Sequence, residues 1–160
     1  MERIPASDYP AVVAATVQRV LRDDSLAGQF KRLQKDLSDP DAFWSELYAL
    51  ALAAALAALE SLPVQIPQPA RAFQCAVRVF TDAGVPPDTR EEMRVTLHSA
   101  MLARLGLYHM AIKSQEPSLA IARLYREAAG ADHLSALSFA GLAVPLVTVF
   151  KDAFSQLVVS

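Results

Sequence analysis

The sequence predicts an all-α fold, a single compact domain of about six to seven helices around a buried helix rich in alanine and leucine. Helix start and stop signals recur at short intervals, and no segment shows the period-two alternation of a half-buried strand. Hydrophobic residues make up 53% of the 160 residues, above the ~45–50% typical of soluble domains. A chain of this length commonly forms one domain, and no flexible linker divides residues 1–160.

The N-terminal segment predicts either two helices or one kinked helix. Asp8 can cap a first helix, and Pro10 is tolerated in its first turn because the missing N–H would have no intrahelical partner. Acidic and serine residues at positions 23–25 interrupt the apolar pattern. The pattern then continues at three-to-four-residue spacing through Leu26, Phe30, Leu33 and Leu37.

The next predicted helix is the one that we place at the centre of the fold. Ser38 or Asp39 can cap it, and Pro40 suits its first turn. The helix is expected over residues 43–61, and residues 47–59 contain no charged or amide side chain. A helix that is apolar all round is normally buried. Its alanines also allow neighbouring helices to approach closely.

Prolines and capping residues define the middle of the chain. Three prolines between residues 62 and 69 remove backbone donors and favour extended geometry, which predicts a stiff, non-helical connector. A helix is expected over residues 70–83, ending at Gly84, which can adopt a left-handed C-cap. Asp88 and Glu91 then form a predicted capping box for a helix that runs to Lys113.

The C-terminal part predicts a short helix followed by a long apolar run. The short helix ends at Gly130, and Asp132 caps the segment that follows. Residues 134–150 are uncharged but include Gly141 and Pro145, so we expect a kink or two helices that meet. This run of 17 residues is at the lower limit for a membrane-spanning helix. A buried core helix is therefore the favoured interpretation.

Charge and cysteine content exclude several function classes. The net charge of −2 gives no field that would attract nucleic acid or an anionic membrane, so neither is an expected partner. Cys75 is the only cysteine, which rules out an internal disulfide and a cysteine-rich metal site. Its apolar neighbours predict a buried, unreactive thiol. The N-terminal residues do not resemble a secretory signal peptide, and we expect a cytoplasmic protein.

Motifs for catalysis or metal binding are absent from the sequence. No nucleophile elbow, glycine-rich phosphate loop or zinc-binding spacing occurs. His98 and His109 are eleven residues apart on one predicted helix, which separates them by roughly 16 Å of axial rise. One metal ion cannot bridge that separation. We therefore assign no catalytic residue and no metal ligand, and the pattern favours a protein that is not an enzyme.

The face of the predicted helix around His98 has two interpretations. The first is an amphipathic helix whose histidines lie at the edge of the core. The second is a pocket in which His98 or His109 meets a small apolar ligand or a haem-like tetrapyrrole, with Met101 and Leu105 packing against it. The second interpretation implies cofactor binding, whereas the first implies none.

Three aromatic residues near the start of the central helix are candidates for an interface. Phe43, Trp44 and Tyr48 either cap the core or anchor a partner, since tryptophan and tyrosine are enriched in binding hot spots. Together with the apolar composition, they predict a non-enzymatic interaction module that forms a homo-oligomer or docks a protein partner. The alternative function is binding of a small apolar ligand or a tetrapyrrole-type cofactor in a globin-like helical pocket.

Overall fold

The computed structural model describes residues 2–35, 40–63 and 65–159, and it confirms the predicted all-α class with a buried central helix. The capping residues Ser38 and Asp39, as well as Leu37, lie outside the described residues. The helices are α1 (Tyr9–Leu21), α2 (Asp24–Lys35), α3 (Pro40–Ser61), α4 (Pro69–Ala83), α5 (Glu91–Ile112), α6 (Pro117–Ala129), α7 (His133–Ala140) and α8 (Ala143–Phe154).

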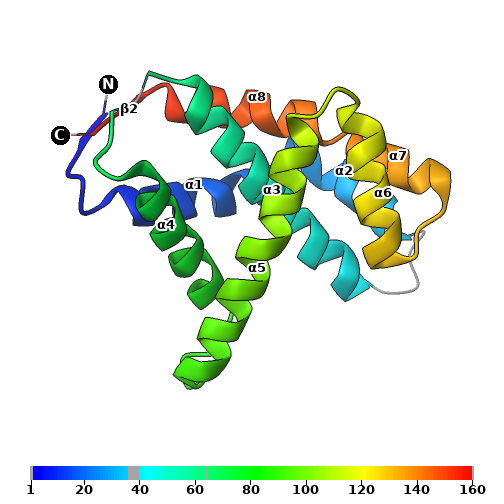
Figure 1. Cartoon of the computed structure of the whole chain (residues 1–160), viewed down its shortest axis with the longest axis horizontal. Helices are drawn as coiled ribbons and strands as arrows, with labels where there is room; N and C mark the ends of the chain where they lie inside the picture. The colour runs from blue at the N-terminus through cyan, green and yellow to red at the C-terminus, as the bar shows by residue number, and fades with distance from the viewer. Residues whose placement is uncertain (1, 36–39, 64, 160) are drawn as a thin grey trace.

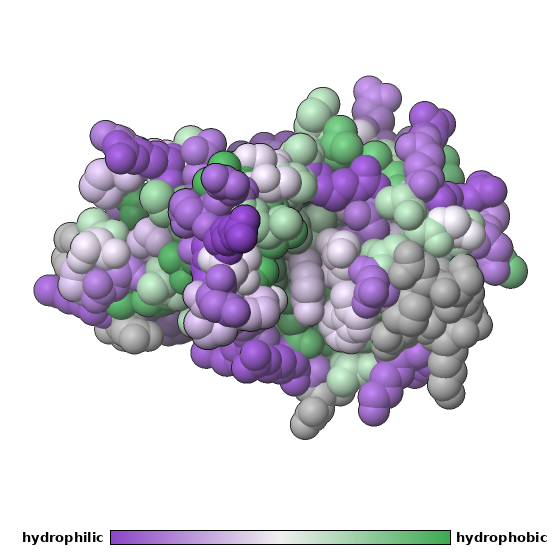
Figure 2. Space-filling model, turned by 90° about the horizontal axis from the view of Figure 1, so that it is seen from below, coloured by the Kyte–Doolittle hydropathy of each residue, from purple (hydrophilic) through white to green (hydrophobic). Residues whose placement is uncertain are grey.

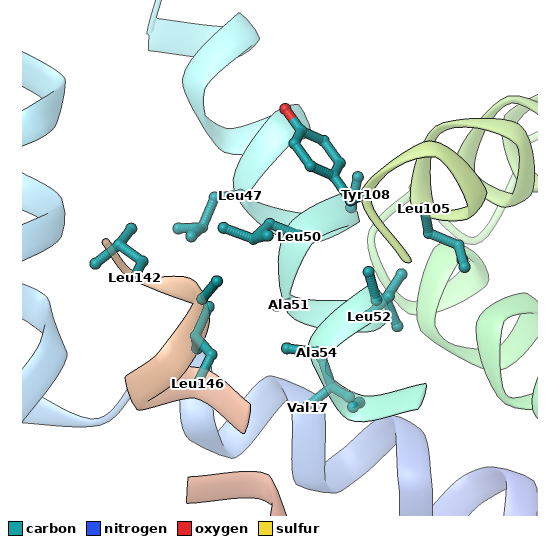
Figure 3. Close-up of a cluster of buried hydrophobic side chains, with 14 of the residues drawn as sticks. Val17, Leu47, Leu50, Ala51, Leu52, Ala54, Leu105, Tyr108, Leu142 and Leu146 are labelled. Atoms are coloured by element: carbon teal, nitrogen blue, oxygen red, sulfur yellow. The ribbon is translucent and has the colours of Figure 1, made fainter. Parts of the chain in front are cut away.

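Helix α3 runs through the middle of the molecule and is enclosed by its neighbours (Figure 1). It packs most extensively against α8 and α5, and it also contacts α1 and α6. Figure 3 shows Leu47 near Leu146 of α8, while Leu52 lies near Leu105 of α5 on another side of the helix. The alanines between them have no exposed surface. Alanine side chains keep the interaxial distances short, which explains why so many helices can surround α3.

The long apolar run near the C-terminus forms two helices rather than one. Helix α7 ends at Ala140 and α8 begins at Ala143, so the break falls at Gly141 and Leu142. Pro145 lies in the first turn of α8, where a proline costs no intrahelical hydrogen bond. The alternative of two helices that meet is therefore the one observed.

Two described stretches are long and apolar enough to cross a membrane. They are Asp41–Ser61 and His133–Phe154. The most apolar windows of these stretches are 61% and 44% buried inside the protein, respectively. The core helix of a soluble protein passes the same test of length and composition, so this finding alone is weak evidence for a membrane span.

Helix ends match the sequence prediction in two places and differ in others. The side chain of Asp132 accepts a 2.7 Å hydrogen bond from the backbone N–H of Ser135, and Gly130 is left-handed with φ of 65°. Gly84, in contrast, has φ of −86°, so the predicted left-handed cap is wrong. Asp8 occupies the N-cap position of α1, but its side chain caps no amide.

The predicted capping box of α5 is also wrong. The helix begins at Glu91, two residues later than a cap at Asp88 requires, because a turn closed by the Thr89 N–H and the Pro86 carbonyl precedes it. The Glu91 carboxylate accepts a 2.6 Å hydrogen bond from Arg78 of α4 instead of folding back on its own helix. A partner on another helix therefore replaces the local cap.

The two ends of the described chain pair with each other. Strand β1 (Glu2–Ile4) lies parallel to β2 (Leu157–Val159), with Arg3 opposite Val158. The sequence pattern does not predict these strands, because three residues are too few to show an alternation. The pairing places both chain ends at one side of the molecule (Figure 1).

The close packing of α3 predicts a specific sensitivity to added volume. Replacing the fully buried Ala51 with leucine should lower the free energy of unfolding by about 1–3 kcal/mol, because the added methyl groups have no space. Urea denaturation measures the loss. Ala57→Leu, at a partly exposed position of the same helix, is the matched control and should change stability much less. Equal effects of the two substitutions would contradict the close packing.

Candidate functional site

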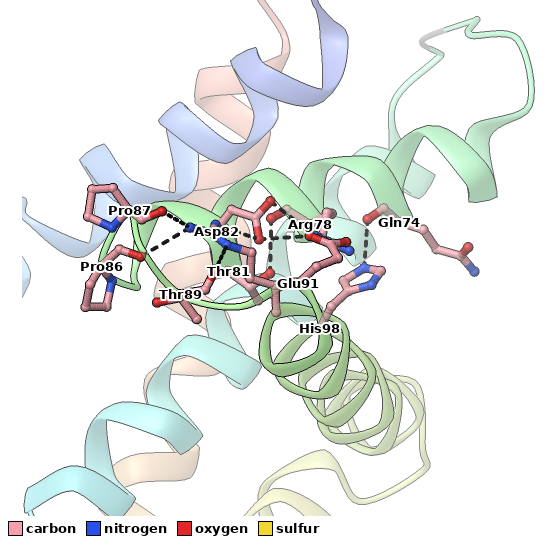
Figure 4. A network of polar contacts seen from close by, with 10 residues as sticks. Gln74, Arg78, Thr81, Asp82, Pro86, Pro87, Thr89, Glu91 and His98 are labelled. Carbon is pink, nitrogen blue, oxygen red and sulfur yellow. Dashed lines mark hydrogen bonds and ion pairs between the residues drawn. The ribbon is translucent and has the colours of Figure 1, made fainter.

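Helices α4 and α5 form a hairpin that stands out from the body of the protein. The two helices approach each other at the end that carries their connecting turn and diverge toward the body (Figure 1). Polar contacts join them near the turn (Figure 4). Arg78 of α4 bonds Asp82 at 3.1 Å and Glu91 of α5 at 2.6 Å, and Arg94 of α5 donates to the Pro86 and Thr89 carbonyls.

A cavity of about 720 Å³ lies where the two helices diverge. The C-terminal part of α3, the proline-containing connector, the start of α4, the middle of α5 and one residue of α1 enclose it. Nine of its twelve lining residues are apolar: Leu56, Leu59, Leu62, Ile66, Pro69, Ala70, Phe73, Leu102 and Leu105. We call this space the α3–α4–α5 cavity.

The remaining lining residues of the cavity are polar, and Glu60 is the charged one among them. Its carboxylate accepts hydrogen bonds from His109 Nε2 and from Lys113 Nζ, the latter at 2.7 Å. Partial burial acts to raise the pKa of Glu60, but the bonds from Lys113 and His109 outweigh it and hold this pKa below its ordinary value. The group is therefore ionised at neutral pH.

Tyr9, at the start of α1, is the second polar lining residue. Its side chain is almost fully enclosed, with 1% of the residue exposed, and burial raises the pKa of its hydroxyl to about 12. Burial is the only cause of this shift, and no hydrogen bond between the hydroxyl and a described residue contributes to it. Gln74 of α4 is the third polar lining residue.

Of the four predicted ligand-binding residues, only Leu105 lines this cavity. His98 Nε2 lies 3.1 Å from the backbone carbonyl oxygen of Gln74, and His109 bonds Glu60. Met101 is partly buried against the core. The Nε2 atoms of both histidines are thus already used in contacts with protein acceptors, and a histidine that bound haem iron through Nε2 would have to release its contact.

The three predicted interface residues form part of a row of aromatic contacts. Phe43 is fully buried and belongs to the core, whereas Trp44 and Tyr48 are partly exposed. The Tyr48 ring packs edge-on against Phe80 of α4, with 5.6 Å between ring centroids. Of the three residues, only Trp44 and Tyr48 therefore reach the surface.

The structure overturns the prediction of a buried Cys75. The buried face of α4 consists of Phe73, Ala76, Val77 and Phe80, and Cys75 falls outside it and is exposed. The apolar neighbours of a helical residue in sequence lie on other faces of the helix, so they do not indicate whether that residue is buried.

A buried polar network was not predicted from the sequence. Glu46 of α3 is nearly fully buried and accepts hydrogen bonds from Arg104 Nε at 2.8 Å and from the Tyr108 hydroxyl at 2.7 Å, both on α5. Arg104 also donates to the Leu124 carbonyl oxygen of α6. Glu46 is the last charged residue before the apolar run of α3, and this isolation is the only signal in the sequence. The network joins three helices and does not line the cavity.

Comparisons with known proteins add no family assignment, since no family model, curated protein or solved structure matches the chain. In the part of the chain that the structure describes, no group of three histidine, cysteine or acidic residues could hold a metal ion. The candidate site is therefore defined by the geometry of the α3–α4–α5 cavity.

The lowered pKa of Glu60 predicts a pH-dependent contribution to stability. Its bonds stabilise the folded state above the ordinary pKa of 4.5 and lose this effect as the pH falls through the lower folded-state pKa. Glu60→Gln should lower the Tm at pH 7 by about 1–3 °C, as for a surface ion pair. The difference from the parent protein should shrink as the pH falls below 4.5 and through the lower folded-state pKa.

Thermal unfolding followed by circular dichroism across this pH range measures the effect. Glu127→Gln, at an exposed position of α6, is the control and should leave the Tm nearly unchanged at every pH. A Glu60→Gln deficit that is as large at pH 3 as at pH 7 would contradict the assignment.

Proposed function

We propose that this protein binds one small, mainly apolar molecule in the α3–α4–α5 cavity. The observation that carries the proposal is a cavity of about 720 Å³ with nine apolar lining residues out of twelve. Ligand sites typically have volumes of about 300–1,000 Å³, apolar walls and a few polar groups that orient the ligand. Transfer of apolar ligand surface from water into such a space supplies the binding free energy.

The walls of the cavity are held in place before any ligand enters. Leu56 and Leu59 belong to α3, which the surrounding helices fix along its length. Ile66 belongs to the connector and Pro69 to the first turn of α4, where the proline ring restricts the backbone. A preformed site loses less conformational entropy on binding than one that must first become ordered.

An apolar organic molecule fits this site better than a haem-like tetrapyrrole. An organic ligand uses the apolar walls and leaves the contacts of His98 with Gln74 and of His109 with Glu60 intact. Haem ligation through Nε2 of either histidine would break one of these contacts. We therefore favour ligand binding without an iron-containing cofactor.

A second candidate function is self-association through the α4–α5 hairpin, and it rests on a separate observation. No residue of α5 from Glu91 to Arg104 is buried. The hairpin carries six large exposed apolar residues, and four of them lie toward its connecting turn, namely Val79, Met93, Val95 and Leu97. Figure 2 looks onto the free end of the hairpin, where hydrophobic side chains lie between hydrophilic ones. A mixed surface of this kind suits a reversible homo-oligomer better than a permanent one.

Ligand binding is tested by filling the cavity. The neutral apolar fluorophore N-phenyl-1-naphthylamine should become more fluorescent when the protein is added, because it leaves water for the cavity. Ala70→Trp places a large side chain at an exposed lining position and should weaken this binding by about tenfold or more, without unfolding the protein.

Ala83→Trp is the matched control, since Ala83 is an exposed alanine of the same helix that does not line the cavity. This variant should bind the fluorophore like the parent protein. No fluorescence change with the parent protein, or equal binding by both variants, would rule out the cavity as the binding site.

Self-association is tested by light scattering coupled to size exclusion over a range of concentrations. The average mass should rise above the 17.3 kDa of one chain. Leu97→Glu should weaken the association by about tenfold or more, because it places a charge in the contact. Leu134→Glu, at an exposed position of α7, is the control. A constant mass of one chain for the parent protein would rule out this function.

A further inference from the structure

We infer that the α3–α4–α5 cavity selects an uncharged amphipathic ligand, with an apolar body and a hydroxyl group as its polar end, over a ligand that ends in a carboxylate. The inference rests on the proposed function and specifies the class of ligand. Two residues that line the cavity, Tyr9 and Glu60, carry the inference.

The Tyr9 hydroxyl supplies the first part of the selection. It belongs to a residue that is 1% exposed and lines the cavity, and burial alone raises its pKa, with no contribution from a hydrogen bond to a described residue. A hydroxyl at the wall of a cavity is open to a hydrogen bond with a ligand. Tyr9 stays protonated at neutral pH and can both donate and accept. A ligand hydroxyl can complete this hydrogen bond.

Glu60 supplies the discrimination by charge. Glu60 lines the cavity, whereas its cationic partner Lys113 and its other partner His109 do not. Of these three residues, Glu60 is therefore the one that a ligand in the cavity contacts. An ionised carboxylate can only accept hydrogen bonds, so it favours a ligand that donates one and repels a ligand carboxylate.

A neutral polar end is also favoured over a cationic one. An ammonium group would be attracted to Glu60, but both interactions of that carboxylate are with groups that the ligand would have to displace. The nine apolar lining residues offer no other charge to compensate for the loss of water around an ion. A hydroxyl group has a much smaller desolvation cost and can form its hydrogen bond with Tyr9 without displacing Lys113 or His109.

Three ten-carbon probes that differ only in their polar end test this selection. 1-Decanol, decanoate and decylamine would compete with N-phenyl-1-naphthylamine for the parent protein at pH 8, each below the concentration at which it aggregates. We expect 1-decanol to displace the fluorophore at a concentration about tenfold lower than decanoate requires, and at a lower concentration than decylamine.

Two variants assign the preference to its residues. Tyr9→Phe, which removes only the hydroxyl, should weaken 1-decanol about fivefold and leave the fluorophore unaffected. Glu60→Gln should bring the affinities for 1-decanol and decanoate closer together. Circular dichroism of both variants checks that the fold is kept. Glu60→Gln changes a partly exposed side chain, so this variant still tests the inference if Tyr9→Phe is unstable.

The outcomes separate this inference from the proposed function. If the fluorophore does not bind the parent protein, the proposed function fails. The cavity is a ligand site if the fluorophore binds the parent protein and Ala70→Trp blocks this binding. If decanoate or decylamine then competes as well as 1-decanol, the selection for a neutral ligand is wrong. Unchanged 1-decanol affinity in a folded Tyr9→Phe variant, or an unchanged preference in Glu60→Gln, also overturns the inference.

Discussion

The burial of α3 on every side is the constraint on which the rest of the structure depends. A helix without charged or amide side chains over residues 47–59 has no strongly polar face to offer to water, and α1, α5, α6 and α8 all pack against it. Its alanines make this geometrically possible. Residues 49–55 of the helix are all buried, partial exposure resumes at Leu56, and Leu56 and Leu59 line the cavity. The candidate site therefore begins where the enclosure of α3 ends.

Much of the fold could be predicted from local patterns. The uncharged run of α3 identified the central helix, and Asp132 and Gly130 marked helix ends that the structure contains. The caps at Gly84 and Asp88 were wrong because the polar groups between α4 and α5 find partners across the hairpin, such as Arg78 with Glu91. A local capping rule cannot account for a competing partner on another helix.

The candidate site was less predictable, because residues far apart in sequence build it. The helical face around His98 includes Leu105, which lines the cavity. Periodicity on one helix could not indicate that His109 bonds Glu60, 49 positions away, or that Tyr9 of α1 faces the same space. Contacts of this kind depend on how helices are placed relative to each other, which a single sequence does not reveal.

The parallel pairing of β1 with β2 has a consequence for the order of folding. Arg3 and Val158 are opposite each other although almost the whole chain separates them, so their pairing closes a very long loop. Contacts at such separation form only after the intervening helices have been assembled, because the entropy of loop closure must be overcome first. The contact between α1 and α8 brings the two ends together. The small sheet is therefore among the last elements to form, and local unfolding should open it long before it opens α3.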